Sequence, residues 1–573
     1  MEELQSSQNN HCYYFFFRSE SPTFDKKEDS YRAILAQILQ DHKDDFDILE
    51  VFAFAMMGST VGQTDASTNE LIDLLGICLP AIGNCYIVLD GIDECSNNNT
   101  LVSDIVAIFK NCPAKILLFS RPNIIPLLDA LTLKHHLTSE AVYSDIELYF
   151  THSLDGLRES RLLPLEANLS ELVHHLVIGA NGMFLWARLM IDYLNSSVWS
   201  PKKRVKLILE VKMPEGLPKM YDRIRDLTCR GHVAEQKLAK WVIIWLLYAQ
   251  RTLTTSELRE SSWVLDMETE DEANDEAHFE QSVLIVCACL VEKTAVKDPR
   301  YLHDALGFRF IHLSVKEYLM GLESRRNSPI TFPQSEVQLI MTRVCIQYLI
   351  SCIPAQTLSG VSGENISDSR LDRKYPLCNY AAIHWIDHLH NAVFSLWKHN
   401  GSHGTSLKTH YNDLMMVFSS FISNARNITT WIEAHNVYGQ KISIESLRKC
   451  SEFAAQNVDM LPEPPKQDVF VDASKLAKDL ERLYEAWGHQ LAKSPCCVWM
   501  ECGAFTPSPF IFNSEAMEIH RLDPKDPETG KLSFKPLRKV SETSSTGLHI
   551  GVLSVWTSRY ISVRHSHCQP VNK

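Results

Sequence analysis

The sequence predicts an α/β domain followed by a mainly α-helical remainder. In the first 121 residues, continuous apolar runs of strand length alternate with segments of helical periodicity. Beyond residue 150 the strand signals fade and helical spacing takes over. Alternation of strands with helices is typical of a parallel sheet with right-handed crossovers, so we expect the first part of the chain to form such a sheet.

The predicted α/β domain has three strands and three helices. The aromatic run 12–18 is continuous, as expected of a strand covered on both faces. From Ser30, which can cap a helix, apolar residues recur with the spacing of one helix face. The strands are expected at Tyr13–Phe17, Tyr86–Leu89 and Lys115–Phe119, and the helices at 30–39, 70–79 and 101–112. We expect the strands to be parallel neighbours, with Asp90 and Ser120 at the same carboxyl edge.

The remainder carries helical patterns interrupted by polar segments. The runs at 169–194 and 237–250 show helical periodicity. The acidic stretch 264–280 is expected to be an exposed loop or insertion, since it lacks the glycine and the aspartate spacing of a calcium-binding loop. Further linkers or loops are expected at 355–373, 397–410 and 503–549.

Composition limits the possible functions. The chain has 573 residues, 45% of them hydrophobic and 22% charged, which suits several globular domains. Its net charge of −14 argues against binding to nucleic acid or acidic membranes. The apolar runs at 241–249 and 283–291 are about half as long as a membrane span requires. Sixteen scattered cysteines and an acidic, polar N-terminus without a signal-peptide pattern favour a cytoplasmic protein with reduced thiols.

Three carboxylates follow the second predicted strand, in the sequence "IVLDGIDE". In nucleotide-hydrolysing α/β domains, an acid at the place of Asp90 coordinates Mg²⁺ through water. An acid just beyond it, here Asp93 or Glu94, can polarise the attacking water. A simpler alternative is that these acids only cap the following helix.

The third predicted strand ends in Ser120 and Arg121, where nucleotide hydrolases often carry a residue that senses the γ-phosphate. We therefore expect Asp90, Ser120 and Arg121 to form the nucleotide-binding edge, with Asp93 or Glu94 in the catalytic role. The alternative is that Arg121 merely pairs with the acids across the strand ends.

Several stretches, in order, resemble the NACHT-domain proteins of the signal-transducing NTPase class, in the form found in fungal immune-receptor-like and incompatibility proteins. The matching stretches are "YYFFFR", "SYRAILAQIL", "YIVLDGIDEC" (the Walker B strand), "ILLFSRP" (the sensor strand), "NGMFLWARLMIDYL", "GLPKMYDRI", "LAKWVIIWLLYAQRTLTTSEL" and "FRFIHLSVKEYL". The resemblance covers about residues 12–325, with a weaker match at 380–389.

The resemblance implies a domain order along the chain. The expected regions are a partial NTPase-like α/β domain at 1–150, a helical region at 151–235, a winged-helix-like region at 236–325, an α-helical region at 326–500 and a partly irregular C-terminal tail at 501–573. The sheet would be P-loop-NTPase-like but incomplete.

The phosphate-binding loop of the family is not found in the sequence. A Walker A loop requires Gly-x-x-x-x-Gly-Lys-Ser/Thr, whose amides and lysine surround the phosphates. The chain has one Gly-Lys pair, Gly530–Lys531, which is followed by leucine and comes after the Walker B strand. The nearest mimic, "GSTVGQT", lacks the lysine. Only eleven residues precede Cys12, so we expect the first strand and its loop to be absent, through N-terminal truncation or as a true remnant.

Three functions remain open on this basis. The first is a regulatory or scaffolding module of a fungal NLR-like protein, inactive as an NTPase and without a cofactor in this chain. The second is an active Mg²⁺-dependent switch, whose full-length form would bind Mg-ATP or Mg-GTP. The third is a helical interaction module, favoured if residues 12–121 were disordered. The expected partners are other protein chains, including possible self-association.

Other candidate sites are less convincing. The groups around Cys496 and around His565 lack the paired spacing of zinc ligands, so structural cysteines are expected there. Cys287 and Cys289 lie in an apolar run and are expected in the core. The helical periodicity around His312 makes core packing the first interpretation of that stretch. In the family, a winged-helix histidine contacts the nucleotide phosphates, and His312 is a candidate for that position.

Overall fold

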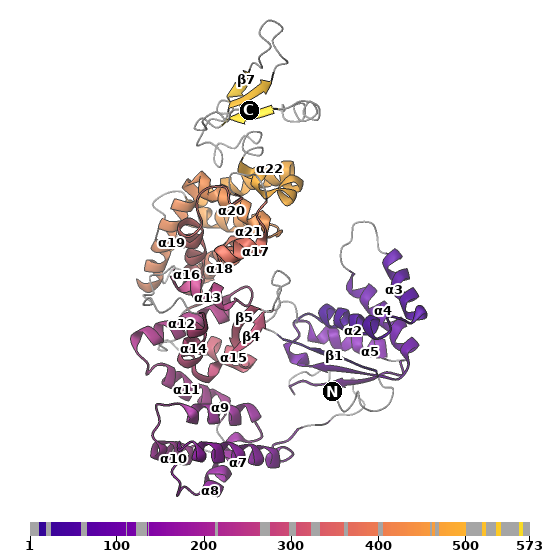
Figure 1. Ribbon diagram of the computed structural model, residues 1–573, viewed down its shortest axis with the longest axis vertical. Helices are drawn as coiled ribbons and strands as arrows, with labels where there is room; N and C mark the ends of the chain where they lie inside the picture. Colours follow the sequence, from indigo (N-terminus) through magenta and orange to yellow (C-terminus); the bar gives the residue numbers. More distant parts are fainter. Residues whose placement is uncertain are drawn as a thin grey trace. The chain divides into compact units, whose positions relative to one another are not determined.

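The computed structural model describes most of the chain as two compact units, 1–220 with 312–314 and 221–311 with 315–573 (Figure 1). The described residues are 11–18, 25–58, 66–109, 112–121, 135, 137–211, 216–263, 276–296, 305–322, 333–359, 365–398, 405–458, 461–463 and 469–499, with three strands at 518–522, 534–539 and 561–564. The domain boundaries expected at 150, 235, 325 and 500 stay predictions.

The first unit contains the predicted parallel sheet. Its strands are β1 (His11–Phe16), β2 (Cys85–Asp90) and β3 (Lys115–Leu118), paired in parallel in the order β1-β2-β3. In the register, Tyr13 pairs with Ile87, and Ile87 pairs with Ile116. The prediction of three neighbouring parallel strands is confirmed, and so is the α/β fold class of this part.

The crossover segments between these strands are helical. The helices are α2 (Lys27–Asp41), α3 (Phe46–Gly58), α4 (Thr68–Ile82) and α5 (Asn98–Phe109). Helix α4 begins at a capping box in which Ser67 and Glu70 satisfy each other's backbone N–H groups. The helices predicted at 30–39, 70–79 and 101–112 correspond to α2, α4 and α5, although α5 begins three residues earlier and also ends earlier than expected.

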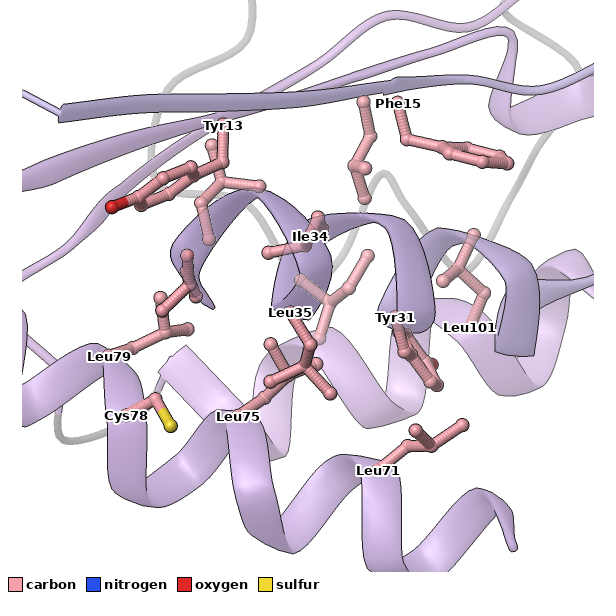
Figure 2. Packing of buried hydrophobic residues seen from close by; sticks show 14 of the residues in the cluster. Tyr13, Phe15, Tyr31, Ile34, Leu35, Leu71, Leu75, Cys78, Leu79 and Leu101 are labelled. Carbon is pink, nitrogen blue, oxygen red and sulfur yellow. The ribbon is translucent and has the colours of Figure 1, made fainter. Parts of the chain in front are cut away.

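The core of this unit lies between one face of the sheet and the helices. Figure 2 shows Tyr13 and Phe15 of β1 above Ile34 and Leu35 of α2, with α4 contributing Leu75. All five are at most 5% exposed. Burial of such side chains contributes roughly 1.5–3 kcal/mol each, so the packing of α2 and α4 on the sheet stabilises this unit.

A run of helices completes the first unit. It consists of α7 (Tyr143–Glu159), α8 (Leu169–Ala180), α9 (Phe184–Asn195), α10 (Pro201–Leu209) and the beginning of α11 (Leu217–Thr228). Arg204 of α10 is 1% exposed and donates to the carbonyl oxygens of Leu194 at 2.6 Å, Ser196 at 2.9 Å and Leu162 at 3.2 Å. Burial lowers the pKa of this guanidinium.

The second unit begins with helices followed by a β-hairpin. The elements are α12 (Val233–Tyr248), α13 (Thr255–Trp263), α14 (Glu276–Val286), β4 (Val291–Val296), β5 (Ala305–Phe310) and α15 (Leu313–Gly321). Strands β4 and β5 are antiparallel, and an antiparallel bridge joins Thr254, just before α13, to Gly307 of β5. A Cβ atom at Gly307 would lie 2.4 Å from the carbonyl oxygen of Leu253, so this close approach requires glycine.

The C-terminal half is mainly α-helical, as predicted. Its helices are α16 (Gln334–Ser351), α17 (Asp368–Lys374), α18 (Cys378–Lys398), α19 (Thr405–Ser423), α20 (Ala425–Val437), α21 (Ile444–Gln456) and α22 (Val469–Lys493). Helices α16 and α18 pack closely, with buried aromatic residues such as Trp385. In the part of the chain that the structure describes, no helix has the length and apolarity needed to cross a bilayer.

Several predicted loops are partly wrong. The acidic stretch 264–280 contains the start of α14, where Phe279 and Glu280 are buried. Helix α14 packs against α12 and α13. Segment 355–373 contains most of α17, which Ser367 caps, and segment 397–410 contains the beginning of α19. The tail 503–549 contains β6 (Glu518–Leu522) and β7 (Phe534–Lys539), which form an antiparallel sheet with β8 (Ile561–Arg564).

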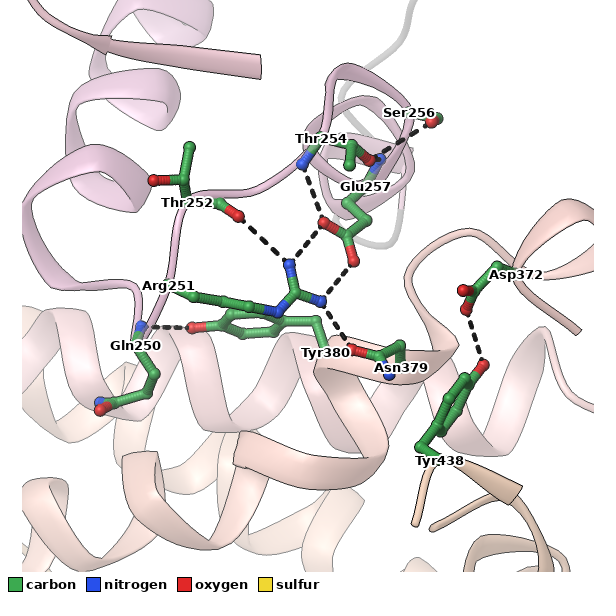
Figure 3. Close-up of polar contacts among 10 residues, drawn as sticks. All are labelled: Gln250, Arg251, Thr252, Thr254, Ser256, Glu257, Asp372, Asn379, Tyr380 and Tyr438. Carbon is green, nitrogen blue, oxygen red and sulfur yellow. Dashed lines mark hydrogen bonds and ion pairs between the residues drawn. The ribbon is translucent and has the colours of Figure 1, made fainter. Parts of the chain in front are cut away.

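A buried polar cluster joins the segment between α12 and α13 to α18 (Figure 3). The Arg251 guanidinium donates to both carboxylate oxygens of Glu257, at 2.6 and 2.8 Å, and to Oδ1 of Asn379 at 2.7 Å. It also lies over the ring of Tyr380, 5.2 Å from the centroid. These contacts of one guanidinium with Glu257, Asn379 and Tyr380 fix the segment before α13 against α18.

A chain of hydrogen bonds extends this cluster to α16. The backbone N–H of Gln250 donates to the Tyr380 hydroxyl at 3.0 Å, and that hydroxyl lies 2.8 Å from Nε2 of His388. Nδ1 of His388 lies 2.8 Å from Oε1 of Gln338. Because Oε1 can only accept, Nδ1 carries the proton and Nε2 accepts from Tyr380. His388 is fully buried, and burial lowers its pKa to about 3, so it is neutral.

Candidate functional site

The candidate site is the carboxyl edge of the parallel sheet. Asp90 is the last residue of β2 and is exposed, and Ser120 follows the end of β3. The backbone N–H of Phe119 donates to the carbonyl oxygen of Leu89 at 2.9 Å, which sets the two strand ends side by side. Asp90 and Ser120 therefore lie at the same edge, as the sequence predicts.

A tight turn carries the acids away from the end of β2. Gly91 has a φ of 72°, in the left-handed region, and Ile92–Glu94 form one turn of 3₁₀ helix. A Cβ atom at Gly91 would lie 3.2 Å from the carbonyl oxygen of Phe17. Ile92 is fully buried, and its N–H donates to the carbonyl oxygen of Phe119 at 3.1 Å. The left-handed backbone conformation of Gly91 and the buried side chain of Ile92 thus hold the turn in place.

Asp93 and Arg121 bind each other at this edge. Oδ1 of Asp93 accepts from the backbone N–H of Arg121 at 3.1 Å, and Oδ2 lies 3.2 Å from its Nε. The Asp93 side chain is 11% exposed and that of Arg121 is 35% exposed. The hydroxyl of Ser120 donates to the carbonyl oxygen of Arg121 at 3.0 Å. The structure therefore contains the ion pair across the strand ends that the sequence left as an alternative.

Asp90 is in a different state from Asp93. Among the described residues, its exposed carboxylate has no hydrogen bond or ion pair. It could hold Mg²⁺ through water, as the resemblance implies, provided that phosphate oxygens completed the coordination. The described part of the chain contains no group of three or more His, Cys, Asp or Glu side chains arranged to hold a metal by itself. The edge thus supplies one available carboxylate and not a complete cation site.

Glu94, the third acid, lies at the end of the 3₁₀ turn and is half-buried. Its backbone N–H donates to the carbonyl oxygen of Gly91 at 2.8 Å. The structure brings Asp90, Asp93, Ser120 and Arg121 to one edge of the sheet. The roles of these four residues and of Glu94 in nucleotide binding or hydrolysis stay predictions.

Gly91 is the residue that the sequence analysis did not single out. A glycine between acids after an apolar strand is nevertheless a recognisable turn signal.

The other candidate residues have structural positions. Nδ1 of His312 lies 2.7 Å from the hydroxyl of Ser314 and accepts from its backbone N–H at 3.1 Å, so the imidazole caps the start of α15. Cys287 is fully buried, where burial raises the pKa of its thiol to about 12, whereas Cys289 is partly exposed. Cys496 and Cys497 are buried. The group around His565 lies outside the described residues.

A shallow hollow of about 490 Å³ lies on α7 and α9. It contains none of the predicted site residues. Its lining consists of Asp145, Leu148, Tyr149, His152, Ser153 and Phe184.

Comparisons with known proteins agree with the resemblance seen in the sequence. Residues 1–121 match the family model described as Nephrocystin 3, N-terminal. The chain is 23% identical over 348 residues to the vegetative incompatibility protein HET-E-1 of Podospora anserina, and the match covers 56% of this chain. It spans 24% of the length of that relative. The chain is thus similar to fungal NACHT-type proteins, as predicted.

The solved structures that the chain matches include the Aeropyrum pernix ORC1 protein in complex with DNA. It shares 14% identity, and the match covers 56% of this chain and 88% of that chain. The TM-score is 0.17, which is too low for the likeness to bear on the function of this chain.

Proposed function

We propose that this chain is a regulatory or scaffolding module of a fungal NLR-like signalling protein, in which the NTPase-like domain acts through its fold and does not bind nucleotide tightly. Its similarity to NACHT-type proteins supports the family of signalling NTPases. Residues 233–310 form α12, a β-bridge at Thr254, helices α13 and α14 and the β4–β5 hairpin, in that order. This order supports a winged-helix-like region after the NTPase-like core. Other protein chains, in a cytoplasmic setting, are the partners that such a module would have.

The observation that carries this proposal is the Asp93–Arg121 pair. A sensing arginine and a water-polarising acid have to face the γ-phosphate, but here each is bound by the other. The chain sequence also contains no Gly-x-x-x-x-Gly-Lys-Ser/Thr. Loss of three charge-assisted hydrogen bonds to phosphate, at about 1.5–3 kcal/mol each, costs on the order of 5 kcal/mol. That corresponds to roughly three to four decades in affinity.

Thermal unfolding in the presence of nucleotide tests the proposal. For the 573-residue chain with Mg-ATP or Mg-GTP near 1 mM, ligand close to its Kd adds only about 0.4 kcal/mol to the free energy of unfolding. An intact site at a hundredfold excess of nucleotide over Kd adds about 2.7 kcal/mol, which is readily measured. We therefore expect almost no shift of the melting temperature.

The control is the double substitution Asp90→Ala with Glu94→Ala. We expect it to leave the small nucleotide response of this chain unchanged, because no tight site depends on those carboxylates. A clear stabilisation by nucleotide that disappears in the double variant would contradict the proposal, since it would reveal a working site built on Asp90.

The second candidate function is an active Mg²⁺-dependent ATP- or GTP-hydrolysing switch. The exposed carboxylate of Asp90 favours it, because that group is available for a water-mediated contact with Mg²⁺. The phosphate-binding loop would then have to come from polypeptide outside these 573 residues. The genomic sequence upstream of the codon for Met1 distinguishes the two candidates: an in-frame Walker A motif there favours the switch.

The third possibility, a purely helical interaction module, would be favoured by disorder of residues 12–121. Most of those residues form the parallel sheet and the helices packed on it. The structure therefore gives this possibility no such support.

A further inference from the structure

Helix α3 packs on the core of the first unit with one side only. Ile48 is 2% exposed, and Val51 and Phe52 pack against the buried residues of this core. Since successive residues of an α-helix are about 100° apart, these three side chains lie on one side of the helix. Figure 1 shows α3 beside α4, with which it packs. Ile48, Val51 and Phe52 thus define the inner side of α3.

The outer side of α3 is also apolar, and it is exposed. It carries Phe46, Leu49, Ala53 and Phe54, which we call the outer face of α3. Phe46 is 75% exposed, Leu49 36% and Phe54 80%. Among the described residues, Phe54, Leu165 and Phe46 are the three most exposed large apolar side chains. A helix that is apolar on both sides is normally buried on both sides, so the outer face has the composition of an interface.

Negative charge surrounds the outer face. Residues 41–54 contain five acidic residues and one lysine. Asp47 and Glu50 are exposed, and in the described part of the chain neither carboxylate has an ion pair or a hydrogen bond. Glu50 is four residues from Phe46 and four from Phe54, a spacing that places it between the two phenylalanines on the surface of the helix. A surface that covers both phenylalanines therefore also covers the Glu50 carboxylate.

We propose that the outer face of α3 is a docking surface for another protein, which presents an apolar helix face that carries lysine or arginine. The outer face has apolar residues at positions i, i+3, i+7 and i+8, which is the anchor spacing of helices that dock on a partner. The basic residue of the partner would pair with Glu50, which otherwise loses its water on docking without gaining a cation. None of these residues belongs to the carboxyl edge of the sheet, so the inference goes beyond the proposed function and is independent of nucleotide binding.

The charge beside the outer face selects this partner over the alternatives. Two α3 helices paired about a two-fold axis would bring the acidic residues of one copy next to those of the other, without a cation between them. An anionic membrane surface would repel the same carboxylates. A purely apolar protein surface would bury Glu50 unpaired. A basic apolar helix both neutralises Glu50 and covers the two phenylalanines.

Binding of synthetic helices to the full chain tests the inference. The probes are two amphipathic peptides of about 18 residues, one of leucine and lysine and one of leucine and glutamate, each with one apolar face. Titration calorimetry is expected to show one-to-one binding of the basic peptide to the wild-type chain. The acidic peptide should bind at least about tenfold more weakly, because it places glutamates opposite Glu50.

Variants of the outer face assign the binding to α3. Phe46→Gln and Phe54→Gln should each weaken binding of the basic peptide at least about tenfold, because each removes a phenylalanine that docking buries. Leu165→Gln is the matched control, since this side chain is 77% exposed but lies outside α3, and its replacement should leave binding unchanged. The urea midpoint should be the same in all four chains, because exposed side chains contribute little to the free energy of unfolding.

A charge reversal tests the role of the carboxylates. The double substitution Asp47→Lys with Glu50→Lys should exchange the preference, so that the acidic peptide binds more tightly than the basic one. The matched control is Glu166→Lys with Glu485→Lys, which changes the net charge equally at two exposed positions outside α3. This control should keep the preference of the wild-type chain.

Four results would overturn the inference. The first is a wild-type chain that binds neither peptide or binds both equally. The second is unchanged peptide binding in both phenylalanine variants, or an unchanged preference in the Asp47→Lys with Glu50→Lys chain. The third is a lower urea midpoint in either phenylalanine variant than in Leu165→Gln, because another segment of the same chain then covers the outer face. The fourth is a wild-type dimer, or cosedimentation with phosphatidylcholine vesicles, that both phenylalanine variants abolish, because a second copy or a lipid surface is then the occupant.

Discussion

Replacement of Arg251 by alanine is expected to lower the free energy of unfolding by about 3–5 kcal/mol, because it leaves the carboxylate of Glu257 buried without its cation. The Glu257 side chain is 1% exposed, and Arg251 contacts both of its oxygens. Loss of the contact with Asn379 and of the stacking on Tyr380 adds to the effect. Urea unfolding of the full chain, followed by tryptophan fluorescence and by circular dichroism, measures the change.

A surface ion pair provides the matched control. Arg448 pairs with Glu445 on α21, where solvent screens the interaction, so Arg448→Ala should leave the urea midpoint almost unchanged. The double variant Arg251→Met with Glu257→Gln should be more stable than Arg251→Ala alone, because no uncompensated charge is buried. If Arg251→Ala costs less than about 1 kcal/mol, the buried pair behaves like a surface pair and the argument is wrong.

Acidification from pH 7 to pH 5 is expected to destabilise the second unit by about 3–4 kcal/mol. Burial lowers the pKa of His388 to about 3 and that of His435 to about 4, with nearby His384 lowering both further and Asp387 partly opposing the shift. In the unfolded chain a histidine has a pKa near 6.5. The unfolded state therefore binds more protons between those values, and stability is lost as the pH falls below about 6.5.

The slope of stability against pH identifies the histidines responsible. Each contributes about 2 kcal/mol by pH 5, so His388→Gln should remove roughly half of the pH dependence, whatever it does to stability at pH 7. His489 is exposed on α22, and His489→Gln should leave the slope unchanged. A urea midpoint that is the same at pH 7 and pH 5 in the wild-type chain would show that neither imidazole is held neutral by the fold.

The sheet could be predicted because its signals are local. The run from Tyr13 to Phe17 and the run from Tyr86 to Leu89 are apolar throughout, which predicts buried strands. The expected cover on both faces is wrong for β1, where Tyr14 and Phe16 are 41% and 42% exposed. The helix between them shows its buried face in the spacing of Tyr31, Ile34 and Ile38. Because neighbouring parallel strands end at the same edge of a sheet, these local signals are enough to predict that Asp90 lies beside the end of the next strand.

The features that the sequence does not reveal depend on contacts between distant parts of the chain. Nothing in the local pattern around Arg251 indicates Asn379, which lies 128 residues further along. The acidic sequence at the start of α14 predicts a loop, whereas Glu280 is accommodated in the helix by an ion pair with Lys293 of β4. Whether Arg121 faces a ligand or Asp93 depends on a side-chain conformation, which residue spacing does not determine.

Gly91 has a consequence for how sequence motifs of this kind are interpreted. Its backbone conformation and its distance from Phe17 favour glycine for steric reasons alone, whether or not the neighbouring acids perform any chemistry. Across related genes, selection for folding can therefore preserve the middle of an Asp-Gly-x-Asp signature after selection for hydrolysis has ended. Where related sequences keep the glycine but replace the acids beside it, the motif indicates a conserved backbone turn and not a conserved enzymatic activity.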